Sequence, residues 1–558
     1  MDVVLEQNFP EGFKPNEPQE VILDGIAQAM ARKKKFIIIN APTGSGKSFI
    51  AKTLANYSRK PDDEFVGMLS NSCRWGNMAQ HGEYSFGAAI LTCTKSLQDQ
   101  YSDLFKDGCV LKGKVNYECG KDNNCLCDSA PCALVDSLKD NCWRKRMCPY
   151  LNARFDAASS RCSFFNYSMY LSLPEFAKYR QFLVCDECSE LEDVIVNEYT
   201  LEVECATLSF LLGSTIVTPD EGSSDSDYYE WLGELNKKVA NAVREISGIF
   251  EMDAKRKRLS KEETKRLRML NEYAGSLNKL LECWDDTEWF KIHSDKGITF
   301  MPYQVDKLAQ RIFNYAETVI LMSATIVNVS KFASILGIGD YHYIDAPSVF
   351  DPARGYITPV SSEFRPNYKN KEDMIPKMAK FAKGLCEHFA GKKGIIHTNS
   401  FDIQKSVMKE VGKDARFLFR RGGVSNEQLL DAHRLSSEPT VLVSPSMTHG
   451  VDLKGDLGEF QIIMKAPYPP LSNPRIKRKF KEDKEWYVDK MLSTLIQACG
   501  RCNRTKDDLS ITFILDYNAY EAIMQNLRKL PKYFGERLSE KSKNRFKELA
   551  AKEDERVL

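Results

Sequence analysis

A phosphate-binding loop constrains the fold of this chain more than any other segment. The sequence APTGSGKS (41–48) follows a short apolar run, FIIIN (36–40), and precedes a stretch compatible with a helix, FIAKTLANYSRK (49–60). A strand, a glycine-rich loop and a helix in this order direct consecutive backbone N–H groups at phosphate oxygens. We therefore expect an α/β domain that binds ATP and Mg²⁺. The predicted phosphate contacts are Thr43, Gly44, Ser45, Gly46, Lys47, which reaches the β- and γ-phosphates, and Ser48, which ligates Mg²⁺.

Further apolar runs predict parallel β-sheets in two parts of the chain. Short apolar strands separated by helical stretches are typical of α/β domains. The length of 558 residues also exceeds a single core, so three or four domains are expected. The predicted strands are AAILTCT (88–94), QFLVCDE (181–187) and TVILMSAT (318–325) in the first part, and GKKGIIHTNSF (391–401), TVLVSPS (440–446), FQIIMKAP (460–467) and ITFILD (511–516) in the second.

Two segments interrupt the first α/β pattern. Residues 111–155 are rich in cysteine and show little strand or helix periodicity. Residues 200–297 contain apolar side chains at helical spacing, then a basic turn (255–258) and a second helical pattern. Ser260 and Glu263 fit a capping box at the start of the second helix. We predict a helical hairpin in this segment.

Two carboxylates at the end of the predicted strand 181–187 suit ATP hydrolysis. Asp186 can hold Mg²⁺, directly or through water, and Glu187 can orient or deprotonate the attacking water. An acidic strand end is usually just a solvated end. Its pairing with the loop at 41–48 makes the catalytic interpretation the stronger one.

A third element of the nucleotide site, QACGRCNR (497–504), lies in the second α/β part. Arg501 and Arg504 are three residues apart on a predicted helix, so both can face the γ-phosphate, and Gln497 is a further predicted catalytic residue. Without the other two motifs, a solvated basic helix would be the default interpretation. Together the motifs predict that ATP bridges two domains and that hydrolysis opens and closes the cleft between them.

A cluster of cysteines lies between the phosphate loop and the acidic strand end. Eight of the 17 cysteines fall between Cys109 and Cys162. Four thiolates can bind Zn²⁺ or hold a [4Fe–4S] cluster, and ordinary thiols in a small domain are the third interpretation. Spacing alone does not decide among them, although the two CxxC knuckles usual for zinc are absent from the sequence.

The motifs together resemble the DinG/XPD family of iron–sulfur DNA helicases in superfamily two. FKPNEPQ (13–19) is similar to the family's adenine-reading segment, with Gln19 as the matching residue. Gly450 and Asp452 fall in a later motif and are further expected nucleotide contacts. The other matching segments are LTCTKSLQDQ (91–100), LKGKVNYEC (111–119), NYSMYL (166–171), DECSELED (186–193), MSAT (322–325), THGVDLKGD (448–456) and QACGRCNR (497–504).

This resemblance implies an α/β fold with two RecA-like P-loop domains in tandem. Residues 1–110, 156–199 and 298–344 would form the first domain, and residues 345–558 the second. A small Fe–S insert at 111–155 and a helical, arch-like insert at 200–297 would interrupt the first. Cys188-Ser189 stand where the family has Ala-His. That histidine couples the nucleotide site to neighbouring motifs, so we expect that Ser189 takes its part or that the coupling differs.

The resemblance also implies a [4Fe–4S] cluster. Cys119 and Cys148 match the outer ligands, and Cys142 matches the third. We choose Cys132 for the remaining position. A 45-residue insert buries little core, so bonds to a metal would supply stability. The competitors for the position of Cys132 are Cys125 and Cys127.

The predicted function is an ATP-dependent DNA helicase, acting as a monomer on single-stranded DNA and on forked or tailed duplexes. The resemblance implies 5′-to-3′ movement and a wedge role for the cluster insert. Residues 111–155 carry eight Lys or Arg against five Asp or Glu, near Tyr117, Trp143 and Tyr150, a composition typical of a single-strand groove. The alternatives are a translocase or an RNA or hybrid helicase of the same superfamily, and a metal-containing ATP-binding regulatory protein.

Composition and the N-terminal sequence indicate the kind of binding surface and the cellular location to expect. A net charge of +1 predicts a local groove for a polyanion and no general basic coat. No apolar run approaches the roughly 20 residues that span a bilayer. The N-terminus lacks the basic start and apolar stretch of a secretory signal. We expect no membrane partner and an intracellular location, cytoplasmic in a bacterial, archaeal or phage-infected cell and nuclear in a eukaryote.

Overall fold

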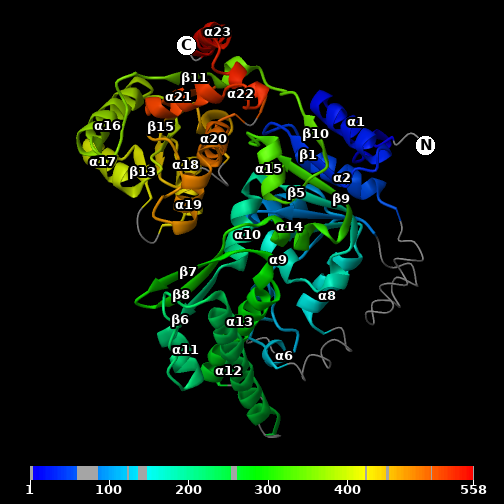
Figure 1. The fold of residues 1–558 in the computed structure, drawn as a ribbon. Helices are drawn as coiled ribbons and strands as arrows, with labels where there is room; N and C mark the ends of the chain where they lie inside the picture. The colour runs from blue at the N-terminus through cyan, green and yellow to red at the C-terminus, as the bar shows by residue number, and fades with distance from the viewer. Residues whose placement is uncertain are drawn as a thin grey trace.

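Two parallel β-sheets dominate the computed structural model, which describes residues 4–59, 86–121, 125–135, 147–252, 260–420, 424–447, 452–503 and 505–556 (Figure 1). The described strands of the first sheet follow the order β10-β1-β9-β5-β2-β4-β3, and all neighbours are parallel. In chain order they are β1 (Phe36–Asn40), β2 (Ala88–Thr92), β3 (Cys109–Val110), β4 (Cys162–Asn166), β5 (Arg180–Asp186), β9 (Ala316–Ser323) and β10 (Tyr341–Asp345).

Helices cover both faces of the first sheet. Ile37 and Ile39 of β1 pack into one core cluster, while Ile38 points to the other face and joins a second cluster. Burial on both faces explains why its strands are continuous apolar runs. The helices of this domain are α1 (Glu17–Ala31), α2 (Lys47–Tyr57), α5 (Lys95–Leu104), α8 (Pro149–Ser159), α9 (Tyr167–Ser172), α10 (Leu191–Tyr199), α14 (Asp306–Phe313) and α15 (Val329–Ile335).

The second sheet forms the other α/β domain. Its described strands follow the order β11-β16-β15-β12-β14-β13, again all parallel. The strands are β11 (Ile357–Pro359), β12 (Gly394–His397), β13 (Phe417–Phe419), β14 (Val441–Ser444), β15 (Phe460–Ile463) and β16 (Ile511–Ile514). The helices are α16 (Lys371–His388), α17 (Phe401–Val411), α18 (Asn426–Leu435), α19 (Pro474–Glu482), α20 (Lys484–Cys499), α21 (Tyr517–Asn526), α22 (Lys532–Glu536) and α23 (Glu540–Arg556).

The helical hairpin predicted in residues 200–297 is present. Its helices are α12 (Asp225–Met252) and α13 (Lys261–Glu282), and the predicted capping box of Ser260 and Glu263 is formed. The segment is not purely helical, however. Strands β6 (Leu201–Glu204), β7 (Trp289–Ser294) and β8 (Gly297–Pro302) form an antiparallel sheet at the base of the hairpin, with helix α11 (Cys205–Leu212) after β6.

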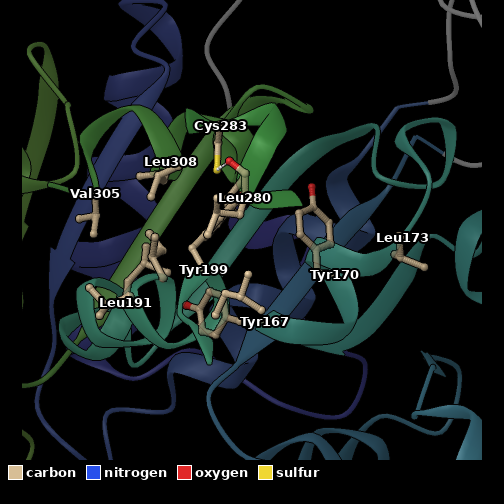
Figure 2. Packing of buried hydrophobic residues seen from close by; sticks show 14 of the residues in the cluster. Tyr167, Tyr170, Leu173, Leu191, Tyr199, Leu280, Cys283, Val305 and Leu308 are labelled. Carbon is tan, nitrogen blue, oxygen red and sulfur yellow. Dashed lines mark hydrogen bonds between the residues drawn. The ribbon is translucent and has the colours of Figure 1, made fainter. Parts of the chain in front are cut away.

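The base of this hairpin shares a hydrophobic core with the first domain. Figure 2 shows Leu280 and Cys283, at the end of α13, beside Tyr199 of α10 and Leu308 of α14. All four side chains are buried. The hairpin is therefore rooted in the domain that carries the phosphate loop.

Within its described residues the cysteine-rich segment has an isolated β-bridge, a 3₁₀ turn at Lys114–Asn116, one short α-helix and the first turns of α8. Glu118 pairs with Leu126, and helix α6 (Pro131–Leu134) follows. Leu134 packs against Leu267 of α13, and Asn271 of α13 donates its Nδ2–H to the Leu134 carbonyl at 3.2 Å. The cysteine-rich segment therefore packs against the helical hairpin. Across the described ranges, none of the helices has the length and apolar character needed to cross a membrane.

Candidate active site

The phosphate loop adopts the turn that its glycines predict. Gly44 and Gly46 have φ of +80° and +78°, the left-handed region that favours glycine. A Cβ on Gly46 would lie 2.2 Å from Nε2 of Gln19, and that nitrogen donates to the Gly46 carbonyl at 3.2 Å. Gln19 and the loop are therefore brought together, as the sequence predicts. Helix α2 begins at Lys47, so its N-terminus faces the loop.

Asp186 ends β5 and Glu187 follows it directly, so the two carboxylates stand at the predicted strand end. Asp186 is buried, and burial, followed by the charge of Glu187, raises its pKa to about 6, against the opposing charge of Lys47. Glu187 has a φ of +51°, a strained conformation for a residue with a side chain. Its Oε2 is buried and finds no hydrogen-bond partner among the described residues. Strain and an unpaired buried oxygen mark a site that a ligand completes.

These donors fit Mg²⁺. The carboxylate of Asp186 and the hydroxyl of Ser48, in the first turn of α2, are hard oxygen donors of the kind that Mg²⁺ prefers. Tyr101 of α5 donates its hydroxyl to Oδ2 of Asp186 at 2.9 Å and orients the carboxylate. Tyr101 directly follows the matched segment 91–100, and the sequence carries no signal for its role because a phenol at that position has no pattern of its own.

The second domain reaches this site through the end of α20. A Cβ on Gly500 would lie 3.6 Å from Oγ1 of Thr43 in the phosphate loop. Gln497 and Gly500 line an interdomain cavity of about 30 Å³ with Pro42 and Thr43. The Oε1 of Gln497 is buried without a hydrogen-bond partner in the described part of the chain. The structure thus joins the first and third predicted motifs.

One detail of the third motif was predicted wrongly. Helix α20 ends at Cys499, so Arg501 lies in the turn beyond it and not on a helix. Arg501 is buried, and its charge is the second cause, after burial, that lowers the pKa of His397 to about 4. The Arg501 carbonyl accepts from the N–H of Leu453, the residue after Asp452, at 3.4 Å. Gly450 and Arg504 lie outside the described residues.

Ser189 occupies the position where the resembled family has histidine. Its Oγ accepts hydrogen bonds from Ser323 Oγ and Thr325 Oγ1, each at 3.0 Å. Ser493 of α20 donates to Thr325 Oγ1 at 3.2 Å. A chain of hydroxyls therefore runs from the strand end of Asp186 to the second domain.

Two further residues without any sequence signal lie beside the cavity. Tyr533 of α22 donates its hydroxyl to the Ala324 carbonyl at 2.7 Å. Arg537 is buried, and its Nη2 donates to Asn503 Oδ1 at 2.9 Å and to the Cys499 carbonyl at 3.2 Å. Both line the cavity. Tyr533 links the second domain to the first, and Arg537 holds the turn after α20 in place.

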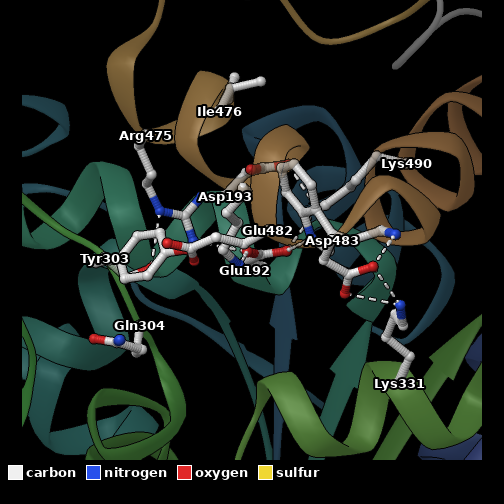
Figure 3. A network of polar contacts seen from close by, with 12 residues as sticks. Glu192, Asp193, Tyr303, Gln304, Lys331, Arg475, Ile476, Glu482, Asp483 and Lys490 are labelled. Atoms are coloured by element: carbon white, nitrogen blue, oxygen red, sulfur yellow. Dashed lines mark hydrogen bonds and ion pairs between the residues drawn. The ribbon is translucent and has the colours of Figure 1, made fainter.

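A buried ionic cluster forms the other main contact between the domains (Figure 3). Glu192 of α10 is surrounded by donors from α19 and α20. Burial alone would raise the pKa of Glu192, but the neighbouring cations outweigh it and hold the pKa well below its usual range. The donors are Arg475, Lys479, Trp486 and Lys490.

The cysteines are grouped only in part. The N–H of Cys127 donates to the Tyr117 carbonyl at 2.8 Å and that of Cys119 to the Cys125 carbonyl at 3.0 Å, so these side chains share one face of the bridge. The Sγ atoms of Cys127 and Cys148 are 4.0 Å apart. Two adjacent thiols fit a zinc or iron–sulfur site. Within the described ranges no group of three ligating side chains is assembled, and Cys142 lies outside them.

Known proteins share this arrangement of domains. The family model described as Helicase C-terminal domain matches residues 385–537. The ATP-dependent DNA helicase YoaA of Escherichia coli (strain K12) is 22% identical over 590 residues, covering 90% of this chain and 92% of that protein. Solved structures of an XPD helicase and of apo XPD have TM-scores of 0.59 and 0.54 at 16% and 15% identity, covering 92% of this chain and 98% of each of theirs.

The resemblance to DinG/XPD-like helicases of superfamily two is confirmed. The predicted fold, two RecA-like domains in tandem, is confirmed with it. In this DinG/XPD-like architecture, the phosphate loop and the strand end of Asp186 belong to the first RecA-like domain. The turn that carries Arg501 belongs to the second.

Proposed function

We propose that this protein is an ATP-dependent DNA helicase that moves along single-stranded DNA, in the 5′-to-3′ direction, and separates duplexes. The observation that carries the proposal is the approach of Gly500 to Thr43, which places the second domain against the phosphate loop. ATP bound there would contact both domains, so its hydrolysis would change how they meet. The similarity to a DNA helicase over 90% of the chain supports DNA as the substrate.

Each part of the site then has a chemical role. Lys47 neutralises the β- and γ-phosphates, while Asp186 and Ser48 hold Mg²⁺. Glu187 activates the attacking water, because its buried Oε2 has no other partner among the described residues. The proposed contacts from the second domain are Gln497, Arg501, Arg504, Gly450 and Asp452, and Gln19 reads the adenine.

We further propose that the cysteine-rich segment holds a [4Fe–4S] cluster and forms a wedge at the fork. Its ligands would be Cys119, Cys142 and Cys148, joined by Cys127 in place of Cys132. The 4.0 Å between the sulfurs of Cys127 and Cys148 supports this choice. When bound, the cluster would stabilise a segment whose described residues, before α8 begins, form only one isolated bridge, one 3₁₀ turn and one short α-helix.

Strand displacement tests the proposal. Protein purified without oxygen is mixed with ATP, Mg²⁺ and a duplex carrying a 5′ or a 3′ single-stranded tail. We expect displacement on the 5′-tailed duplex. If the protein hydrolyses ATP on single-stranded DNA but displaces no strand, it is a translocase and not a helicase. Stronger stimulation by RNA than by DNA would identify an RNA or hybrid helicase.

A further inference from the structure

Glu192 is a buried carboxylate at the domain boundary with no role in the chemistry proposed above. It lies in the first turn of α10, five residues after Glu187, and its side chain is 5% exposed. Its Oε1 accepts from Arg475 Nη2 at 2.7 Å and from Lys479 Nζ at 2.5 Å. Figure 3 shows this carboxylate between the two domains.

The other oxygen of Glu192 holds helix α20. Oε2 accepts from the indole Nε1 of Trp486 at 3.0 Å and lies 3.3 Å from Lys490 Nζ. Lys490 also pairs with Asp193 at 2.9 Å. All four donors thus come from the second domain, and the acceptor comes from the segment that carries Glu187. A buried carboxylate held by three hydrogen bonds and a further ion pair fixes position closely, because losing a cationic partner leaves a charge without solvent.

The residues of α20 that face the first domain lie on one side of the helix. Trp486, Lys490, Ser493 and Gln497 are spaced by four, three and four residues. Trp486 and Lys490 contact Glu192, Ser493 contacts Thr325, and Gln497 lines the cavity beside the phosphate loop. At about 1.5 Å of rise per residue, Gln497 lies roughly 10 Å along the helix from Lys490. The axial position of α20 at Glu192 therefore sets where Gln497 and the Arg501 turn meet the nucleotide.

We propose that Glu192 is a positioning residue for ATP hydrolysis. It fixes the position of α20 along its axis relative to Asp186 and Glu187. The catalytic groups of the second domain are thereby placed at the distance from the γ-phosphate that hydrolysis requires. It sets the hydrolysis rate and leaves ATP affinity, which the phosphate loop provides, largely unchanged. The rate effect rests on the proposed function, whereas the register of α20 does not.

The other ion pairs across this boundary provide matched controls. Arg478 pairs with Glu288, and their side chains are 36% and 48% exposed. Exposed pairs of this kind contribute little to stability and position. Glu288→Gln makes the same change from carboxylate to amide at the same boundary. Its partner Arg478 lies on α19, the helix that also supplies donors to Glu192.

The central experiment compares Glu192→Gln with Glu288→Gln in the full-length protein. Steady-state ATPase is measured on single-stranded DNA, and thermal unfolding shows whether each variant is folded. For Glu192→Gln we expect kcat to fall on the order of tenfold to a hundredfold, because misplacing catalytic groups by about 1 Å has effects of this size. KM for ATP should stay within about threefold of wild type. Glu288→Gln should match wild type in both.

A second variant separates charge from register. Glu192→Asp keeps the buried charge but shortens the side chain by one methylene, so it should unfold near the wild-type temperature and still lose kcat. If Glu192→Asp and folded Glu192→Gln both hydrolyse ATP at the wild-type rate, Glu192 has a purely structural role and the proposal is wrong. A loss of ATP affinity that matches the loss of kcat/KM would also overturn it.

Hydrogen–deuterium exchange tests the register without relying on catalysis. In Glu192→Gln the amides of α20 should exchange faster than in wild type, while Glu288→Gln should leave them unchanged. If the wild-type protein fails to hydrolyse ATP, the proposed function is wrong, and exchange in α20 alone decides whether Glu192 positions the helix. Unchanged exchange in Glu192→Gln would refute the role of Glu192 whatever the ATPase result.

Discussion

In the nucleotide site, the functional side chains stand at the ends of strands in a sheet whose two faces are both buried. Asp186 and Ser323 end neighbouring strands, β5 and β9, and Lys47 begins the helix after β1. In the cysteine-rich segment, Cys119 and Cys127 are held by a single bridge between Glu118 and Leu126. The first site is therefore shaped by the fold. Under the proposed function, the second would depend on bonds that a bound metal adds.

The largest expected effect lies in the nucleotide site. Glu187→Gln should lower the ATPase rate on single-stranded DNA by on the order of 10²–10⁴-fold, since an amide cannot take the proton of the attacking water. Because the sheet shapes this site, ATP binding and the unfolding temperature should stay near wild type. Glu190→Gln, three residues away, is the control. A rate within tenfold of wild type would exclude Glu187 as the base and would favour an ATP-binding regulatory protein.

The next effect concerns the cysteine-rich segment alone. Cys127→Ser should lose most of the bound iron and sulfide and the visible absorbance, because Cys127 lies beside Cys148. Cys132→Ser should keep them. Limited proteolysis should then cut residues 111–155 faster in Cys127→Ser, while ATP binding persists.

The opposite pattern, with iron lost in Cys132→Ser and kept in Cys127→Ser, would restore Cys132 as the ligand. Zinc without sulfide in the wild type would refute the iron–sulfur proposal. Failure of ATP binding after loss of the metal would contradict the contrast between the two regions.

A smaller effect is expected where the two domains exchange hydroxyl hydrogen bonds. Ser189→Ala removes the acceptor shared by Ser323 and Thr325. Each lost hydrogen bond is worth about 0.5–1.5 kcal/mol, so kcat should fall roughly 2–10-fold with little change in KM. Ser330→Ala removes an exposed hydroxyl that donates to Asn328, the N-cap of α15, and should have no effect. A wild-type rate for Ser189→Ala would show that the hydroxyl chain does not couple the domains.

The smallest expected effect is a gain in folding stability, dependent on pH, when the buried carboxylate of Asp489 is replaced. Burial, the largest cause, raises the pKa of Asp489 to about 6, and both of its oxygens are buried without hydrogen-bond partners among the described residues. Because the folded state binds this proton more tightly than the unfolded state, Asp489 destabilises the fold above about pH 6. This destabilisation becomes smaller as the pH falls toward about 4, because Asp489 becomes protonated first in the folded state and then in the unfolded state as well.

Asp489→Asn should therefore raise the unfolding temperature at pH 7.5 and match wild type near pH 4.5, as measured by scanning fluorimetry. Asp193→Asn, at an exposed carboxylate, should give no such pH trend. A constant difference across this range would contradict the assignment to Asp489.

Continuous apolar runs and local motifs were the predictable part of this molecule. Strands such as β1 and β9 are buried on both faces, so nearly every residue is apolar and the run stands out. The short strands β6 and β13 did not stand out. Leu201 and Val203 alternate with Glu202 and Glu204, a pattern too short to distinguish from a loop or helix end.

Within the site, the residues that could be predicted were those that form a local motif, because their chemistry requires a fixed spacing along the chain. The phosphate loop and the strand end with Asp186 are of this kind. Tyr101 and Tyr533 were missed, and Glu192 received no role although it lies in the matched segment 186–193, because each acts on a partner far away in sequence and its type alone is uninformative. The cysteines fall between these cases: their types indicated a metal, but only the β-bridge and the position of Cys148 distinguish Cys127 from Cys132.

The position of β1 in the first sheet has a consequence for how the protein is made. Phe36 pairs with Val319 on one side and with Tyr341 on the other. At about 5–20 residues per second, a ribosome would complete these neighbours some 15–60 s after releasing β1. During that interval the strand has two unpaired backbone edges and two uncovered apolar faces, a state that favours aggregation or chaperone binding. Strand β1 is thus among the first segments to be synthesised and among the last to complete its pairing in the sheet.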